Sequence, residues 1–538
     1  MNKIFKLFTY SLLTVMFFSS CKKFVDVNND PNNNQSTNAT FVMTGALGTT
    51  YRNQVSTNVH IVPATWTGIY AHSTSFTGGG NDKTYEFTSA DYNAFLPLFD
   101  NLTDYNYVIK NADKDGAGYL KDPANVMQCY VYQELVDLYG DVPYEFAFQG
   151  VNNITPKYTN QKVIYEDLVV RLDSAMDRMQ RTTWPTSADF TVQDIYFGLN
   201  KNRWIRFANT LKLRILMRQS FMPGRDAYIQ SHLLTRLSNG FLDQNVLVQP
   251  GYQNISGKLN PFYANFGYNE INNVTTNYQY RKTNAVIINF LKSSGGPSDT
   301  TRVADTFRLQ SLAYPIGSTF ATAASALTSI TSGTATVDSY VGIPLGIGSG
   351  FATDGASPIG PFQINIGSGT RPGMMMLLAE SKFLQAEYTE RYGVTFGGQT
   401  SQSLYEQGIR DHFRTVGSPS TAGNTANETA DGFSFRYYNR PLDNVSYTSS
   451  TDKIKAILLQ KWISLTHING LEQWSEYRKA SGTASVGIPS GVSVKTTAQT
   501  SNPEPVRYLY PQGEFDNNGN NVPQNINRFT SKIFWDVN

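Results

Sequence analysis

The chain has 538 residues, which is more than one hydrophobic core usually holds, so two or more packed regions are expected. It has 44 Lys and Arg residues against 42 Asp and Glu residues, a formal net charge of +2, which argues against the basic surface of a nucleic-acid-binding protein. Two cysteines exclude a disulfide framework, whereas 32 Tyr, 32 Phe and 6 Trp residues suffice both to fill cores and to line a surface that stacks on a ligand.

The N-terminus is typical of an export signal. A positively charged start precedes an apolar run from Leu7 to Phe18, which suits the hydrophobic region of a signal peptide and is too short to span a bilayer. Cys21 follows two serines, and this arrangement resembles the cleavage site of a bacterial lipoprotein. We therefore predict that residues 1–20 are removed and that Cys21 is acylated, which would anchor the protein to a membrane that it does not cross. The alternative is an ordinary secretory signal cut near Ser20.

A tether and a series of helices are predicted next. Residues 21–38 are rich in Asn and are predicted to form a flexible tether. Apolar residues then recur at spacings of three and four, which is the pattern of amphipathic helices. The predicted helices lie within residues 39–52, 89–111, 121–139, 161–181, 201–220 and 225–238. Residues 55–87 mix aromatic residues with Gly, Ser and Thr and are predicted to be a turn or loop region.

The clearest helix is predicted over residues 201–220. Its apolar stripe consists of four residues spaced as on one helix face: Trp204, Ala208, Leu211 and Ile215. Basic residues, including Lys212 and Arg218, lie largely outside this stripe, so the helix is expected to be amphipathic. The small Ala208 leaves room for a second helix to approach closely. With its neighbours, this helix predicts an α-rich, repeat-like series of antiparallel helix pairs.

The rest of the chain changes character twice. Residues 239–370 are rich in Gly, Ser, Thr, Asn and Tyr and contain one short helical pattern, at 283–291, so an irregular region is predicted. Helical patterns return after Pro372, at residues 376–393, 404–413 and 453–467. Gly470 is expected to close the last of them, and the small residues Ala379 and Gly408 would let two of these helices pack closely.

No local motif indicates a zinc site or a catalytic nucleophile. Five histidines, at positions 60, 72, 232, 412 and 467, occur without an H-E-x-x-H or C-x-x-C motif, and residues 346–350 match neither a G-x-S-x-G elbow nor a P-loop. Glu380, Glu387 and Glu390 could supply the carboxylates of a glycoside hydrolase, but at helical spacing they are expected to form a solvated face. Cys129 is expected to be a small buried hydrophobic residue. We predict no enzymatic activity, no metal and no cofactor.

Several short sequence motifs, which we call words, occur in order along the chain. They are GDVPY at 140–144, DTTR at 299–302, YVGIPLG at 340–346, LLAESKFLQAEY at 377–388, W-x-E-x-R at 474–478 and R-x-x-Y-P-x-x-E at 507–514. Together with the helix at 201–220, these words resemble those of the SusD/RagB family of nutrient-binding outer-membrane lipoproteins. The resemblance covers nearly the whole mature chain.

The resemblance implies a mainly α fold in one SusD-like domain over residues 39–538. It implies a tetratricopeptide-like scaffold of helix pairs at about 39–238 and 371–480, an irregular, loop-rich, ligand-side region at about 239–370, and a C-terminal segment at 481–538. It also implies a partner, a SusC-like TonB-dependent β-barrel transporter, to which the protein would deliver an oligosaccharide as a hinged lid. The expected location is the outer membrane, where the lipid-anchored protein would face the exterior, with no nucleic-acid partner.

Ligand-binding residues are predicted from their chemistry, since none carries over from the family by motif. An aromatic ring that covers the apolar face of a sugar removes surface from water, whereas exchanging a hydroxyl group's hydrogen bonds gains little. The candidates are Trp66, Tyr70, His72 and Tyr85 in the early loop, and Asn272, Tyr278, Tyr280 and Arg281 in the irregular region. For each candidate, packing in the core or in a loop is the alternative role.

Three other functions stay open at this point. A protein of the same uptake type could bind an oligopeptide, which a charged cleft would favour over an aromatic surface. A surface glycan hydrolase is disfavoured by the missing motifs. A purely structural helical-repeat scaffold would carry no aromatic loops that a ligand protects.

Overall fold

Some segments predicted from the sequence lie outside the described part of the structure. The computed structural model describes residues 37–76, 80–186, 193–293, 305–316, 337–365, 367–417, 430–480, 488–489, 492–494 and 504–537. The predicted signal, Cys21, most of the predicted tether and the word at 299–302 fall outside these ranges. Within them, no helix combines the length and the apolar character needed to cross a membrane.

The first part of the chain is built of helices that pack in chain order. They are α2 (Ala39–Gln54), η2 (Thr57–Ile61), α3 (Val62–Trp66), α4 (Asn81–Thr84), α5 (Phe95–Asn111), η3 (Gly118–Leu120), α6 (Lys121–Tyr139), η4 (Gly150–Asn152), α7 (Gln161–Arg181), α9 (Lys201–Met217), α10 (Asp226–Leu234) and η5 (Leu237–Asn239). Helix α5 packs on α2 and α6, α7 packs on α6, and α9 packs on α7. This succession confirms the predicted mainly α fold.

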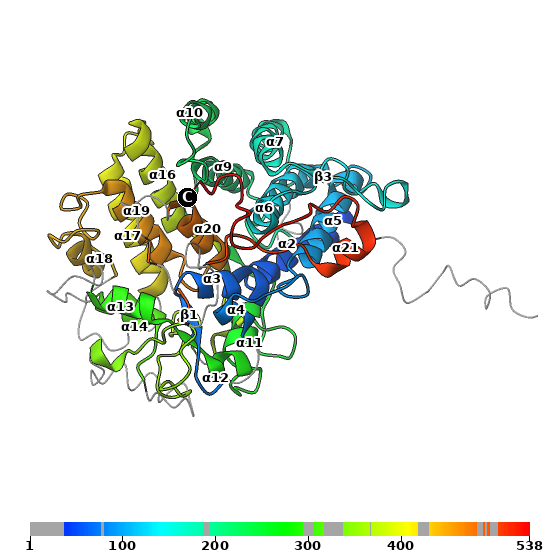
Figure 1. The fold of residues 1–538 in the computed structure, drawn as a ribbon. Helices are drawn as coiled ribbons and strands as arrows, with labels where there is room; N and C mark the ends of the chain where they lie inside the picture. Colours follow the sequence, from blue (N-terminus) through cyan, green and yellow to red (C-terminus); the bar gives the residue numbers. More distant parts are fainter. Residues whose placement is uncertain are drawn as a thin grey trace, which may run out of the picture.

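A second group of helices follows the irregular region. They are α16 (Leu378–Tyr392), α17 (Ser401–Gly417), α18 (Ala430–Tyr438), α19 (Lys453–Ser464), α20 (Gly470–Ala480) and α21 (Gln512–Asn518). Helix α16 packs on α17 and α19 and also contacts α9, so it joins the two helical groups (Figure 1). Gly408 allows close packing of α17 on α16, as predicted, because a Cβ there would lie 2.7 Å from the ring of Phe383.

Short elements make up the irregular region. Its helices are α11 (Pro261–Phe266), α12 (Thr276–Tyr280), α13 (Ala285–Ser293), α14 (Thr306–Leu312), η6 (Val337–Ser339) and η7 (Ser368–Thr370), of which the sequence predicted α13 alone. The strands of the described residues form antiparallel pairs: β1 (Tyr70–His72) with β5 (Arg281–Thr283), β2 (Val142–Pro143) with β3 (Tyr158–Thr159), and β4 (Val246–Val248) with β6 (Gly373–Met376). β1 and α11 to α14 lie together on the lower side of the molecule in Figure 1.

Several predicted boundaries differ from the structure. The helix predicted from residue 89 begins at Phe95, because the Thr88 N–H and hydroxyl donate to the carboxylate of Asp91 and close a turn before the helix. Gly470 begins α20 instead of closing α19, which ends at Ser464. A Cβ at Gly470 would lie 2.0 Å from the carbonyl oxygen of His60, so glycine is needed where α20 meets η2. Residues 55–87, predicted to be turns, also contain η2, α3, β1 and α4.

Charged residues outside the predicted apolar stripes of two helices are buried. Lys212 of α9 and Arg218, the residue that caps the C-terminus of α9, are at most 1 % exposed, and so are Glu380 and Glu387 of α16. Periodicity cannot distinguish a solvated face from a face that meets opposite charges, since both are polar. The expectation of a solvated glutamate face is therefore wrong for Glu380 and Glu387. Cys129, by contrast, is fully buried as predicted.

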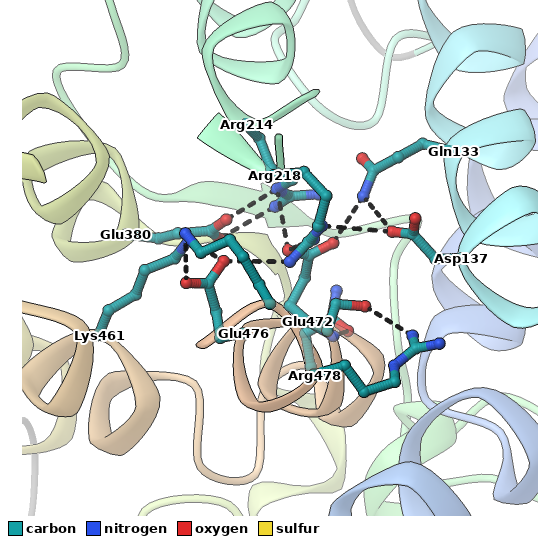
Figure 2. A network of polar contacts seen from close by, with 12 residues as sticks. Gln133, Asp137, Arg214, Arg218, Glu380, Lys461, Glu472, Glu476 and Arg478 are labelled. Carbon is teal, nitrogen blue, oxygen red and sulfur yellow. Dashed lines mark hydrogen bonds and ion pairs between the residues drawn. The ribbon is translucent and has the colours of Figure 1, made fainter. Parts of the chain in front are cut away.

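The buried charges form an ion-pair network where α6, α9, α16, α19 and α20 meet (Figure 2). Arg214 of α9 donates to both carboxylate oxygens of Glu380, at 2.7 and 3.0 Å. Arg218, one turn later, donates to Glu476 at 3.0 Å and to Glu472. These contacts bind α9 to α16 on one side and to α20 on the other.

Further partners complete the charge balance of the network. Lys461 of α19 donates to Glu476 at 2.8 Å, and Lys479 lies 3.0 Å from the other carboxylate oxygen of Glu476. Gln133 of α6 donates to Glu472 at 2.8 Å. Burial by itself would raise the pKa of Glu472, but the charges of Arg214, Arg218 and Lys461 hold it below its usual value. The carboxylate therefore stays ionised, and removing one of its cationic partners would lower the free energy of unfolding.

Replacing Arg218 with methionine is expected to lower the free energy of unfolding by about 3–5 kcal/mol, because Glu472 and Glu476 would stay buried with too few cations. The measurement is urea unfolding. The control is Arg414→Met, which removes an ion pair with Asp431 whose two side chains are 54 % and 48 % exposed, and a loss below about 1 kcal/mol is expected there. Equal losses in the two variants would contradict a structural role of the network.

One carboxyl group beside the network lacks a matching partner. Glu134 of α6 is 2 % exposed, and neither of its carboxyl oxygens has a hydrogen-bond partner within the described part of the chain. Burial raises the pKa of Glu134 well above its usual value, and the negative charge of Glu472 raises it further. The folded protein therefore holds a proton on Glu134 that the unfolded chain releases above about pH 4.5. The contribution of Glu134 to stability therefore falls as the pH rises above that value.

The variant Glu134→Gln is expected to gain stability relative to the natural protein as the pH is raised, because an amide has no proton to lose. Urea unfolding at pH 5 and pH 8 measures this difference, which should be larger at pH 8 by roughly 1 kcal/mol or more. Glu145→Gln, at an exposed position, is the control. Its free energy of unfolding should differ from that of the natural protein by the same amount at both pH values. A pH-independent effect of Glu134→Gln would mean that this carboxyl group is ionised in the folded protein.

Candidate functional site

Four of the eight predicted ligand-binding residues lie in the hydrophobic core, and a fifth, Arg281, is also buried. The four are Trp66, Tyr70, Tyr85 and Tyr278. The indole N–H of Trp66 donates to the carbonyl oxygen of Asp82 at 2.9 Å, and its ring centroid lies 5.5 Å from that of Phe87. The hydroxyl of Tyr278 donates to the carbonyl oxygen of Ile359 at 3.0 Å. These four residues therefore pack in the core, which was the alternative to a ligand-binding role.

Tyr70 lies at the centre of a buried hydrogen-bond chain that ties β1 to the helical scaffold. The Gly470 N–H donates to His60 Nδ1 at 2.9 Å, so His60 carries its proton on Nε2 and donates to the Tyr70 hydroxyl at 3.1 Å. Tyr70 donates in turn to His467 Nδ1 at 2.7 Å, and His467 Nε2–H donates to the carbonyl oxygen of Leu312 at 2.8 Å. Burial lowers the pKa of His60 to about 3 and that of His467 to about 4, so both rings are neutral at pH 7.

Strands β1 and β5 bring two predicted residues from distant parts of the chain together. His72 lies opposite Arg281 in this pair, and both reach the carboxylate of Asp82, at 2.8 Å from His72 Nε2 and 3.4 Å from the Arg281 guanidinium. Burial lowers the pKa of His72, and the charge of Arg281 lowers it further. Burial would raise the pKa of Asp82, but His72 and Arg281 hold it below its usual value. An ionised Asp82 therefore fixes the positions of both side chains.

A group of aromatic rings lies beside this strand pair. Phe76 stacks on His72 with a centroid distance of 4.9 Å and an interplanar angle of 12°, and its centroid lies 5.4 Å from that of Tyr280. The Thr74 N–H donates to the carbonyl oxygen of Phe351 at 2.6 Å, and the Phe351 N–H donates to the Thr74 hydroxyl at 3.1 Å, which brings Phe351 to the same loop. The rings of Phe76, Tyr280 and Phe351 belong to partly exposed residues, whereas the side chain of His72 is only 8 % exposed beneath Phe76. We call His72, Phe76, Tyr280 and Phe351 the ring surface.

Polar groups lie near the ring surface. Lys282 follows Arg281 on β5, and burial lowers its pKa to about 8, although the charge of Asp354 opposes this shift. Asp354 is exposed in the turn that follows Phe351. Asn272, the remaining predicted residue, is exposed in the turn between α11 and α12, where its φ is 61°. Lys282 and Asp354 are thus close in sequence to Tyr280 and Phe351 of the ring surface, whereas Asn272 lies in a turn of its own.

Sequence reasoning missed two members of the ring surface, Phe76 and Phe351. Phe76 lies in the same early loop as His72, so its aromatic side chain next to polar loop residues was a usable signal. Phe351 could not be found in this way, because its position follows from hydrogen bonds to Thr74, which is 277 residues away in the chain. The pairing of β1 with β5 is equally non-local.

The three glutamates that could have supplied the carboxylates of a hydrolase are engaged in other contacts. Glu380 and Glu387 are neutralised by buried cations, and the hydroxyl of Tyr447 donates to Glu390. Among the residues that the structure describes, no group of three His, Cys, Asp or Glu side chains is placed to hold a metal ion. The ring surface is suited to binding, since rings offer apolar contact without a reactive group.

Comparison with known protein families gives one match that spans most of the chain. A SusD-like family model, described as "Starch-binding associating with outer membrane", matches residues 31–511. No curated protein sequence matches the chain significantly.

Solved structures with the same fold come from several bacteria. A chitin-binding SusD homologue from Flavobacterium johnsoniae is 19 % identical, with a TM-score of 0.67, over 92 % of this chain and 99 % of that one. A SusD homologue from Bacteroides fragilis is 19 % identical, with a TM-score of 0.69, over 93 % and 99 % of the two chains. An outer-membrane protein from Bacteroides vulgatus associated with nutrient binding is 18 % identical, with a TM-score of 0.70, over 93 % and 100 %. At these identities the likeness shows a shared fold.

Proposed function

This chain belongs to the SusD-like family of outer-membrane binding proteins, and we propose that it is a cell-surface lipoprotein that captures oligosaccharides and delivers them to a SusC-like TonB-dependent transporter. Members of this family bind nutrients and are not catalysts. The observation that carries the choice of ligand is the ring surface, which presents partly exposed aromatic side chains on the irregular side of the molecule.

The chemistry of a sugar explains why such a surface suits it. Each sugar hydroxyl group is already hydrogen-bonded to water, so exchanging it for a protein partner contributes little net free energy. A pyranose also has an apolar face of C–H groups, and covering that face with a ring removes apolar area from water at about 25 cal/mol per Å². Rings fixed by β1, β5 and the Thr74–Phe351 contact need little reordering when a ligand binds.

The proposed tether suits delivery to a membrane partner. The described chain begins at Thr37, whose carbonyl oxygen accepts a hydrogen bond from Tyr107 of α5. The 16 residues from an acylated Cys21 to Thr37 would reach at most roughly 55 Å when fully extended. A lid on such a tether stays near its transporter while it opens and closes.

Tyr280→Ala and Phe76→Ala are each expected to weaken oligosaccharide binding about tenfold, or about 1.4 kcal/mol, because each removes one aromatic face. Isothermal titration calorimetry with malto-, xylo- and chito-oligosaccharides and with oligopeptides would measure this. Phe435→Ala is the control, since Phe435 is 59 % exposed on α18, away from β1 and α12. Heat with peptides alone would overturn the choice of ligand, and turnover of any compound would overturn the binding role.

Cys21→Ala is expected to abolish incorporation of labelled palmitate and to release the protein from the outer-membrane fraction. Cys129→Ala is a matched control, because it removes the other cysteine of the chain, which is buried in α6. The readouts are mass spectrometry of the mature N-terminus and fractionation of cells. An unmodified N-terminus in the natural protein would rule out the lipid anchor.

A further inference from the structure

A pocket of about 930 Å³ lies between α2 and residues 250–265, a volume within the usual range of ligand pockets. Gly45 and Gly48 of α2 contribute to one wall. A Cβ at Gly45 would meet no atom within 4 Å, so the missing side chain leaves this wall hollow. The opposite wall is formed by the segment from Pro250 to Lys258 and by α11.

The charge of this pocket has one sign. Arg52 and Lys258 line it, whereas no Asp or Glu side chain does. Both cations are exposed, and neither forms an ion pair with a carboxylate among the described residues. Some other arginines on the surface of the helical scaffold are paired, for example Arg206 with Asp243. Arg52 and Lys258 thus give the pocket a positive charge that no carboxylate of its lining offsets, so the pocket would attract an anion.

The wall that carries Lys258 is fixed in place by hydrogen bonds. The side-chain oxygen of Gln249 accepts from the Gly251 and Tyr252 N–H groups, at 3.2 and 2.9 Å. The Gln253 N–H donates to the carbonyl oxygen of Lys258 at 2.8 Å, which closes the turn. Tyr252 is half-buried in the lining, where burial raises its pKa and the charge of Arg52 opposes that shift. The pocket thus offers a guanidinium, an ammonium and a phenol from a defined backbone.

Helix α11 separates this pocket from the ring surface. Asn265 faces the pocket, and its side-chain oxygen accepts from Asn277 of α12, the helix that ends at Tyr280. On the other side of α11, the ring of Phe262 packs edge-on against His60 at 5.6 Å, and His60 binds Tyr70 of β1. The pocket and the ring surface are therefore two sites attached to one buried connection.

We propose that this cationic pocket, lined by Arg52, Tyr252 and Lys258, is a second ligand site that binds the carboxylate or sulfate group of an acidic oligosaccharide. The planar guanidinium of Arg52 can hold such a group through two parallel N–H bonds, and Lys258 adds a mobile positive charge. The Tyr252 ring offers an apolar face to the sugar that carries the acid. The preference for an anion rests on the pocket alone, whereas a sugar as its carrier rests on the function proposed above.

The test compares ligands that differ in charge alone. Oligogalacturonate and its methyl ester share one backbone, and a sulfated oligosaccharide tests the other source of charge. Calorimetry on the full mature chain should show at least tenfold tighter binding of one acidic probe than of its neutral counterpart, and the preference should shrink as NaCl is raised. Whether the carboxylated or the sulfated probe binds more tightly identifies the anion.

Variants separate this proposal from the function proposed above. Arg52→Gln and Lys258→Gln should each reduce the preference for the acidic probe, and the double variant should remove it without weakening the neutral ligand. Arg181→Gln and Lys114→Gln, at exposed positions elsewhere, should change nothing. Tyr280→Ala should weaken binding at the ring surface and leave the anion preference in place.

Three results would overturn the cationic pocket as an anion site. They are equal binding of acidic and neutral probes, no binding of any acidic probe, and a preference that survives in the double variant. Loss of neutral-ligand binding in Tyr280→Ala would still support the proposed function in each of these cases. Binding of acidic probes with no effect of Tyr280→Ala on any ligand would instead support the pocket and count against the ring surface.

Discussion

Arg218 donates to two carboxylates of α20, and one turn earlier Arg214 holds a carboxylate of α16, so α9 is bound to both helices by buried charge. A buried ion pair adds little stability over apolar packing, but a charge left without its partner costs several kcal/mol, roughly 3–5. Apolar stripes tolerate many alternative packings, whereas this network is satisfied when α6, α9, α16, α19 and α20 meet in one arrangement. The network therefore selects the way in which two helical groups, separated by more than 100 residues, come together.

The same network explains what the family-like words in the sequence encode. Glu380 and Glu387 belong to LLAESKFLQAEY, Glu476 belongs to W-x-E-x-R, and Arg218 belongs to the family-like stretch at 201–220. The guanidinium of Arg478, the last residue of W-x-E-x-R, lies 3.7 Å from the ring centroid of Trp474. These words thus describe the interior of the scaffold, which is why they identify the family and are silent on the ligand.

The helices could be predicted because their signals are local. The ranges of α6 and α7 follow from the spacing of apolar residues, and the Asn160 side chain caps α7 by accepting from the Lys162 N–H. The burial of Lys212 and Glu380 could not be predicted in this way, because it depends on partners far along the chain. The candidate site has the same limit. Its residue types were predictable, but the pairing of β1 with β5, which brings His72 opposite Arg281, is not local.

The two proposed ligand sites share one support, the chain from Gly470 through His60, Tyr70 and His467 to Leu312. Each histidine accepts through Nδ1, so protonating either ring would remove an acceptor and break the chain. With pKa values of about 3 and 4, the two rings stay neutral in the folded protein well below pH 6.5, where the unfolded chain takes up protons. The support therefore loses stability as the pH falls below 6.5, but its geometry persists down to about pH 4. Both proposed sites are therefore preorganised at neutral pH, and ligand binding does not have to order the segments that form them.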